Sequence, residues 1–266
     1  MNLIRKTAKL LTLPILNKNE RKDARAKVEK LLHRVFKTER YRCEQAYLQI
    51  LQDNRALGFE RYHLVSLGYN CFGRMTFNYW GLKPRKADGE KTMPFDISVH
   101  PLSTVIKLLQ TRFADYFDNM VYDRTEQCWK NPDLGITFVH DHENDAELFK
   151  KRYTNRIEAF YAAVEDERPC LFFAYTDTEA DVARINELNE VLKQLCPHKR
   201  FKLVYMIFNH PLPRGIDSEV AVYRADYPQG YVHMDIYTKY HKAGFEFEAG
   251  VVSYVRRQIE QLLSEK

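Results

Sequence analysis

The sequence predicts an α/β protein with three layers, in which helices cover both faces of a mostly parallel sheet and a helical extension precedes it. In the second half of the chain, short apolar runs alternate with longer stretches of helical periodicity. Residues 170–175 and 201–208 are the clearest strands, and apolar residues recur at helical spacing between them. Strands that alternate with helices usually pair in parallel and are buried on both faces, so this pattern indicates a doubly covered sheet.

The other elements follow from the same periodicities. Residues 63–67 read as a buried strand, and residues 135–142 as a strand that carries polar residues at its end. Residues 115–135 are aromatic-rich and irregular. Helical spacing is found in 20–57, 74–80, 102–113, 145–164, 182–195 and 251–263, and a further strand is expected over 219–224. We expect the helices of 20–57 to pack on the main domain.

Charge divides the chain into two parts. Residues 1–40 contain 12 Lys or Arg and 4 Asp or Glu, a net charge of +8, whereas the whole chain carries only +5. The remainder therefore carries −3. We predict a basic helical segment over residues 1–60 and an α/β domain over residues 61–266. The charge of the second part argues against nucleic acid as its partner.

The first residues predict a short basic amphipathic helix. Its apolar side chains are Leu3, Ile4, Leu10, Leu11 and Leu13. They face either a lipid interface or the protein's own core, and the first alternative predicts peripheral contact of residues 1–18 with the inner membrane. No apolar run reaches the roughly 18 to 20 residues of a membrane span, and the features of a cleaved signal peptide are incomplete. We therefore expect a cytoplasmic protein.

The spacing of the cysteines and the absence of two glycine motifs argue against several classes of site. The five cysteines are an odd number and widely spaced, which argues against a disulfide framework or a structural zinc site: Cys43, Cys71, Cys128, Cys170 and Cys196. Neither a phosphate-binding loop nor a dinucleotide-binding glycine motif is present. We predict no cofactor.

Cys71 is the strongest candidate for a reactive residue. It follows the strand over 63–67 and the turn at Gly68, and it opens the helix over 74–80. Helix N–H groups and the positive end of the helix dipole favour a thiolate there, and N–H groups around residues 70–72 are candidates to stabilise an oxyanion. The structural alternative is a small buried side chain.

A cysteine nucleophile needs a base and a group that orients the base. His140 is one candidate base, with Asp141 beside it and Asp96 in the loop that follows the Cys71 helix. His233 is the rival base, because the last part of an open α/β chain often supplies the histidine. His140 and His142 also have a metal-binding spacing, but local spacing supplies no third ligand, and we predict no metal.

Three sequence blocks carry a resemblance to a known family. They are Val-Ser-Leu-Gly-Tyr-Asn-Cys at 65–71, Met-Pro-Phe-Asp at 93–96, and Phe-Val-His-Asp at 138–141 followed by the helix around 153–156. Together they resemble the bacterial family described as putative papain-like cysteine peptidases, over residues 62–210. The family's Pro-Phe-Asp block usually continues with Trp, where this chain has Ile97. The resemblance implies Cys71 as nucleophile, His140 as base, and Asp96 or Asp141 as the orienting acid.

The glycine turn before Cys71 is also similar to that of bacterial polysaccharide-biosynthesis proteins thought to transfer or hydrolyse acyl groups. The sequence thus predicts a cysteine-dependent hydrolase or acyl transferase, acting on a small-molecule or glycan substrate in surface-polysaccharide biosynthesis. The alternative is a non-catalytic component of a polysaccharide assembly that binds a glycan or a partner at the inner membrane face.

Overall fold

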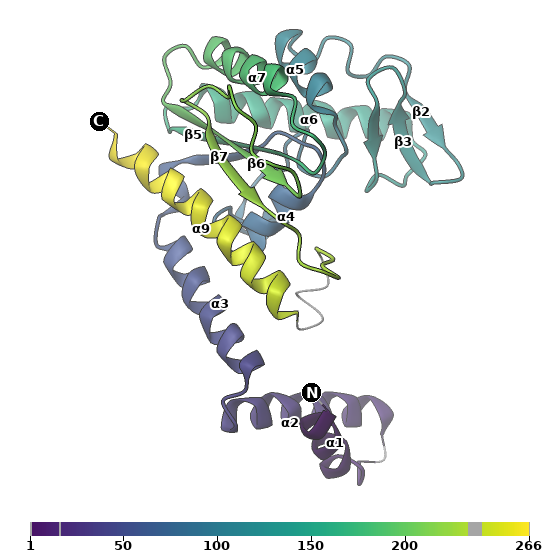
Figure 1. The fold of residues 1–266 in the computed structure, drawn as a ribbon. Helices are drawn as coiled ribbons and strands as arrows, with labels where there is room; N and C mark the ends of the chain where they lie inside the picture. The colour runs from purple at the N-terminus through teal and green to yellow at the C-terminus, as the bar shows by residue number, and fades with distance from the viewer. Residues whose placement is uncertain (1, 16, 234–240, 266) are drawn as a thin grey trace.

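A four-stranded parallel sheet lies at the centre of the protein (Figure 1). The structure is a computed structural model, and it describes residues 2–15, 17–233 and 241–265. The strand order is β1 (His63–Ser66), β5 (Cys170–Thr176), β6 (Phe201–Phe208) and β7 (Ala221–Ala225). All neighbouring pairs are parallel, so the carboxyl ends of the four strands meet at one edge of the sheet.

Each strand contributes alternate side chains to two separate cores. In β5, Phe172 and Ala174 belong to the first core, whereas Phe173 and Tyr175 belong to the second. The first core is covered by α5 (Leu102–Gln110), α6 (Ala146–Glu165) and α7 (Val182–Leu195). The second is covered by α4 (Phe72–Tyr79), α9 (Lys242–Ser264) and the end of α3 (Glu39–Arg55). The three-layer α/β fold predicted from the sequence is confirmed.

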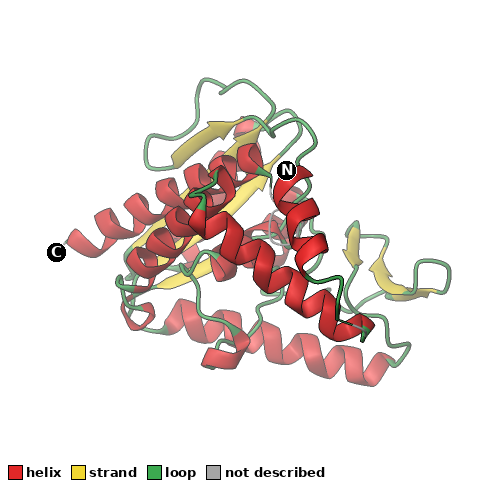
Figure 2. Ribbon diagram, turned by 90° about the horizontal axis from the view of Figure 1, so that it is seen from below, coloured by secondary structure: helices red, strands yellow, loops and turns green. Residues whose placement is uncertain are grey.

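A second, antiparallel sheet lies to one side of the first (Figure 2). It contains β2 (Val121–Asp123), β3 (Cys128–Asn131) and β4 (Ile136–Phe138). The sequence predicted a longer strand over 135–142, and it assigned no elements to the irregular residues 115–135. β4 ends early because the chain turns after Phe138, where the Asp141 N–H donates to its carbonyl at 3.0 Å. β2 and β3 escaped detection because three- and four-residue strands are too short for a visible period.

Three helices precede the domain, and only the last of them packs on it. α3 contacts α9, and Asn54 near its end donates a 2.7 Å hydrogen bond to the Trp80 carbonyl. By contrast, α1 (Asn2–Leu11) and α2 (Lys18–Val35) extend away from the sheet (Figure 1). α2 contains no buried residue. Of the one or two helices expected to pack on the domain over 20–57, α3 therefore does so, whereas α2 buries no residue.

Two short 3-10 turns complete the described elements, at Phe59–Arg61 before β1 and at Lys86–Asp88 after α4. Within the described ranges, no helix combines the length and the apolar composition that crossing a bilayer requires.

Close approach of α4 to the sheet depends on Gly73. A Cβ atom at this position would lie 2.7 Å from the Phe173 ring and 3.0 Å from the Ser66 hydroxyl. Phe173 is fully buried in the second core and also packs edge-to-face on Phe77, so it has little room to move. A residue without a side chain is thus required where the helix crosses β1 and β5.

Gly73→Ala should lower the free energy of unfolding by about 1–3 kcal/mol, the usual cost of overpacking a core. Urea denaturation measures this change. Gly250→Ala is the matched control in another helix, because its Cβ would meet only the Tyr223 hydroxyl, at 3.0 Å. That substitution should be neutral or stabilising, since alanine favours helix over glycine. Equal stability of the two variants would contradict the packing argument.

Candidate functional site

A tight turn at the carboxyl end of β1 places Cys71 at the sheet edge. Gly68 and Tyr69 both have left-handed backbone angles, with φ of +93° and +67°. Glycine adopts this conformation freely, whereas at tyrosine it is uncommon and strained. The Tyr69 N–H donates to the His100 carbonyl at 3.3 Å, which ties the turn to the segment before α5. Cys71 is the N-cap of α4, as the strand–turn–helix pattern predicted.

The surroundings of Cys71 favour the thiol over the thiolate. The side chain is half-buried, and this burial raises its pKa more than a hydrogen bond from its own backbone N–H lowers it. The next N–H, of Phe72, donates at 2.8 Å to the Asn70 side chain. The direction of the pKa shift is opposite to that predicted from the sequence, because loss of hydration outweighs the helix end. The Phe72 N–H is also committed, which removes one predicted oxyanion donor.

His233 lies beside the cysteine turn. Its ring centroid is 5.1 Å from that of Phe72, the residue that follows Cys71. Its Nδ1 lies 3.2 Å from a carboxylate oxygen of Glu248, which is fully buried. A neutral histidine that donates from Nδ1 to a carboxylate carries its lone pair on Nε2, the form that a general base requires.

Among the described residues, three side chains bind Glu248. Trp80 donates to it at 2.8 Å and Tyr231 at 2.7 Å, in addition to the contact with His233. Sequence reasoning missed this residue. The signal was present, since Glu248 is the one acid within the buried stripe of α9: Gly244, Phe247, Glu248, Val251, Val252, Val255, Ile259 and Leu262. An acid in an apolar stripe is buried only when donors reach it.

His140, the other predicted base, lies on the exposed turn after β4. Its side chain makes no hydrogen bond or ion pair with the residues that the structure describes. His142 is engaged elsewhere, with Nδ1 2.9 Å from the Gln127 carbonyl. Among the residues that the structure describes, neither His140 nor His142 forms a hydrogen bond with Cys71, whereas the His233 ring packs on the adjoining Phe72 ring.

Asp141 anchors α6. Its carboxylate is buried and accepts hydrogen bonds from Arg152, from the Tyr153 hydroxyl at 2.8 Å and from Arg156 at 3.4 Å. All three donors belong to α6, and Asp141 follows β4 closely. This carboxylate therefore joins the antiparallel sheet to the helix, and its partners are arginine and tyrosine instead of an imidazole.

Asp96 belongs to a buried ion cluster. It is fully buried, accepts from the Met93 N–H at 2.8 Å, and lies 3.6 Å from Arg74 and 3.9 Å from Lys83. Lys83 in turn donates to the Leu64 carbonyl at 2.7 Å. Arg74 is one turn after Cys71 in α4. Asp96 thus fastens its loop to α4 and β1, and the structure pairs it with cations.

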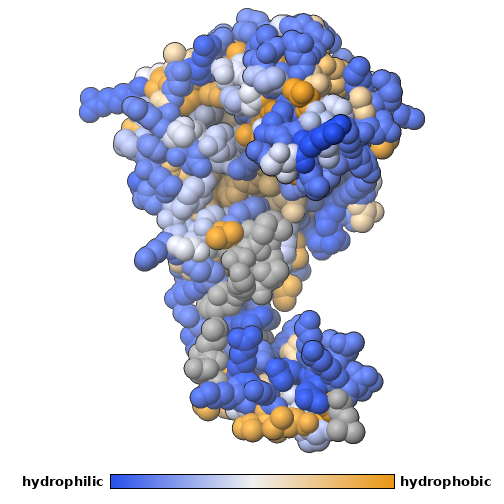
Figure 3. Space-filling view, turned by 90° about the vertical axis from the view of Figure 1, so that its right-hand side faces the viewer, coloured by the Kyte–Doolittle hydropathy of each residue, from blue (hydrophilic) through white to orange (hydrophobic). Residues whose placement is uncertain are grey.

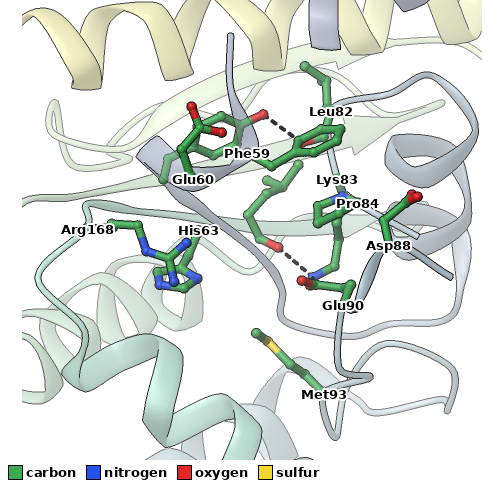
Figure 4. A pocket seen from close by; sticks show the side chains of 13 residues that line it. Phe59, Glu60, His63, Leu82, Lys83, Pro84, Asp88, Glu90, Met93 and Arg168 are labelled. Carbon is green, nitrogen blue, oxygen red and sulfur yellow. Dashed lines mark hydrogen bonds and ion pairs between the residues drawn. The ribbon is translucent and has the colours of Figure 1, made fainter. Parts of the chain in front are cut away.

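The ion cluster borders a cavity of about 320 Å³ near the amino end of β1 (Figure 4). Lys83 and Glu90, 3.1 Å apart, form one wall, and His63 and Arg168 lie together on another. Because this cavity includes the first residue of β1, it lies at the edge of the sheet opposite the turn that carries Cys71.

A smaller cavity of about 210 Å³ opens at the carboxyl edge, where open α/β sheets usually bind ligands. Tyr69 and Tyr175 line it, and burial raises the pKa of Tyr175, with a smaller contribution from nearby groups that include Cys71. A hydrogen bond to Asp177, with burial, raises the pKa of Tyr69 to about 12. Neutral tyrosines therefore line this cavity, and Tyr69 lies two residues before Cys71 in the same turn.

Alkylation of Cys71 should be slow at neutral pH. Burial raises its pKa, so the reactive thiolate becomes abundant only at a higher pH than for a small-molecule thiol. Peptide mapping after iodoacetamide treatment at a series of pH values measures the rate at this residue, with a free cysteine derivative as reference. If the alkylation rate of Cys71 rose with an inflection at a lower pH than that of the free cysteine derivative, the thiolate would be stabilised, which would contradict this account.

Asp141→Asn should lower the free energy of unfolding by about 3 kcal/mol, because it removes the buried charge that compensates Arg156, which is buried, and Arg152, which is half-buried. Chemical denaturation tests the change. The control is Asp115→Asn. Asp115 is exposed, and its ion pair with Lys107 is weak because the two groups are 4.0 Å apart and in contact with water. If both variants were as stable as the unaltered protein, Asp141 would not be an anchor.

Comparison with known proteins identifies the family. The model of the family described as "Putative papain-like cysteine peptidase (DUF1796)" matches residues 62–210, more than half of the chain. This range begins at β1 and ends after β6, and it includes Cys71, Asp96, His140 and Asp141. No curated protein and no solved structure matches the chain. The chain therefore belongs to the putative papain-like cysteine peptidase family.

Proposed function

We propose that this protein is a cysteine-dependent hydrolase or acyl transferase in which Cys71 is the nucleophile, His233 the base and Glu248 the group that orients the base. The observation that carries the proposal is the packing of the His233 ring on the Phe72 ring, with their centroids 5.1 Å apart. In addition, the buried Glu248 carboxylate lies 3.2 Å from His233 Nδ1. This arrangement supports the proposal because His233 and Glu248 are far in the sequence from the turn that carries Cys71, and yet His233 packs beside that turn.

The reaction begins from a neutral thiol, in keeping with the raised pKa of Cys71. The sulfur attacks the carbonyl carbon of an ester or amide while His233 Nε2 takes the thiol proton. Glu248 stabilises the imidazolium that forms, and the proton then passes to the leaving oxygen or nitrogen. Water, or another hydroxyl or amine, attacks the thioester in the second half and restores the thiol. Attack by water gives hydrolysis, and attack by another hydroxyl or an amine gives acyl transfer.

The lining of the edge cavity supports a polyhydroxylated acceptor or substrate. Three tyrosines line it together with polar residues that include Thr176 and Asp181; the tyrosines are Tyr69, Tyr175 and Tyr205. Aromatic faces with a few polar groups at fixed positions suit sugar rings. We therefore propose an acyl ester of a glycan or of a small molecule as the substrate. We also propose that the protein acts in bacterial surface-polysaccharide biosynthesis.

A second candidate is a non-catalytic component that binds a glycan or a partner in a polysaccharide assembly. The observation that favours it is again the raised pKa of Cys71, since a thiol that is not activated can simply fill space at the turn. The same tyrosine-lined cavity would then bind the glycan without reacting.

Acylation of Cys71 separates the two candidates. The full chain is incubated with p-nitrophenyl acetate, and acetyl transfer to each cysteine is followed by peptide mass spectrometry. A catalytic site should acetylate Cys71 faster than a free cysteine derivative at the same pH. His233→Gln should slow this step by about 100-fold, the usual contribution of a positioned base.

His140→Gln is the matched control, because that histidine lies on an exposed turn. It should leave the acetylation rate unchanged. Loss of acetylation in His140→Gln with retention in His233→Gln would reverse the assignment of the base. If Cys71 in the unaltered protein reacts no faster than the free derivative, the catalytic proposal fails and the binding candidate stands. Thermal unfolding of both variants shows whether they are folded.

A further inference from the structure

The two N-terminal helices, α1 and α2, expose apolar side chains far from the domain. We call residues 2–15 and 17–37 the helical arm. Leu3 is 78% exposed and Leu10 65%, and the other exposed apolar residues are Leu11, Leu13, Leu31, Val35 and Phe36. In Figure 3 an apolar patch occupies the lowest part of the arm and is bordered by hydrophilic surface.

The arm does not bury these side chains on the protein's own core. α1 packs on α2, and its buried positions there are Ala8 and Thr12, the latter just after the helix. α2 buries no residue, even though α1 and α3 both adjoin it. Of the two alternatives left open by the sequence, docking of Leu3 and Leu10 on the core is therefore wrong. Leucines exposed on a folded helix pair are costly in water unless something covers them.

The charge of the helical arm limits which kind of partner can cover its exposed leucines. Residues 1–40 carry a net charge of +8. In α1, Arg5, Lys6 and Lys9 form no ion pair with any residue in the described ranges. Leu3 and Leu10 are seven positions apart and share one face of the helix, whereas Arg5 and Lys9 lie toward the other side. An apolar face with basic flanks and no compensating acids suits a surface that is apolar inside and anionic outside.

We propose that the helical arm docks on an anionic lipid surface, with the apolar face of α1 among the acyl chains and its basic side chains at the headgroups. A second copy of the chain fits less well, because two arms of charge +8 repel each other. Nucleic acid would satisfy the basic residues but would leave the leucines in water.

The base of the arm adjoins the domain at the start of α9. Lys242 in the first turn of α9 forms a 2.8 Å ion pair with Glu39, the first residue of α3. Figure 1 shows the amino end of α9 directed toward the arm. α9 is a single helix that also carries Glu248, so docking of the arm would hold the domain with this end of α9 nearest the lipid.

Sedimentation with vesicles tests the proposal on the full chain. Vesicles of phosphatidylcholine with phosphatidylglycerol should bind the protein, and vesicles of phosphatidylcholine alone should bind it weakly. Leu10→Ser with Leu11→Ser should weaken binding by about 100-fold, roughly tenfold for each leucine removed from the acyl region. Lys6→Gln with Lys9→Gln should weaken it by about 30-fold, and added salt should have a similar effect.

Matched controls lie on the domain. Leu212→Ser changes another exposed leucine, and Lys150→Gln with Lys151→Gln changes two exposed lysines of α6. Neither control should alter vesicle binding. The proposal is overturned if the unaltered chain fails to sediment with anionic vesicles, or if the leucine and control variants sediment alike. It is also overturned if the chain is a dimer that the leucine substitutions dissociate, or if it binds duplex DNA more tightly than vesicles and independently of the leucines.

Discussion

The contact of α4 with the sheet at Gly73 is the constraint on which the candidate site depends. Because this helix lies directly on Phe173 and Ser66, its first turn has a defined position above the ends of β1 and β5. The left-handed turn at Gly68 and Tyr69 lies in the short segment 67–71 that connects the two elements. Cys71 is therefore placed by backbone geometry, and its neighbours are those that the second core brings to the same edge.

Three buried carboxylates link distant parts of the chain. Asp96 joins its loop to α4 and β1 through Arg74 and Lys83, Asp141 joins β4 to α6, and Glu248 joins α9 to Trp80 at the end of α4. A buried charge is tolerated only when donors compensate its lost hydration, so each carboxylate specifies which segments meet. Of the three, Glu248 alone has an imidazole among its partners. This difference separates a candidate positioning residue from two structural ones.

The helical arm follows a different physical rule from the domain. In the domain, apolar side chains are buried in two cores, whereas in the arm leucines are exposed and Arg5, Lys6 and Lys9 form no ion pair with any residue that the structure describes. The model of the putative papain-like cysteine peptidase family matches residues 62–210, and the arm lies outside this range. The site and the arm are thus separate features of one chain, joined through α3 and the first turn of α9.

The sequence alone determined the fold class, the strand–turn–helix that carries Cys71, and the family. Each of these depends on local periodicity or on motifs within a few residues, which are visible without coordinates. Tertiary structure decided the surroundings of Cys71, the partners of Asp96 and Asp141, and the pairing of His233 with Glu248. Those properties depend on which distant side chains share a buried space and how much water they lose. A sequence pattern specifies which residues are apolar or charged, but only packing specifies which of them meet.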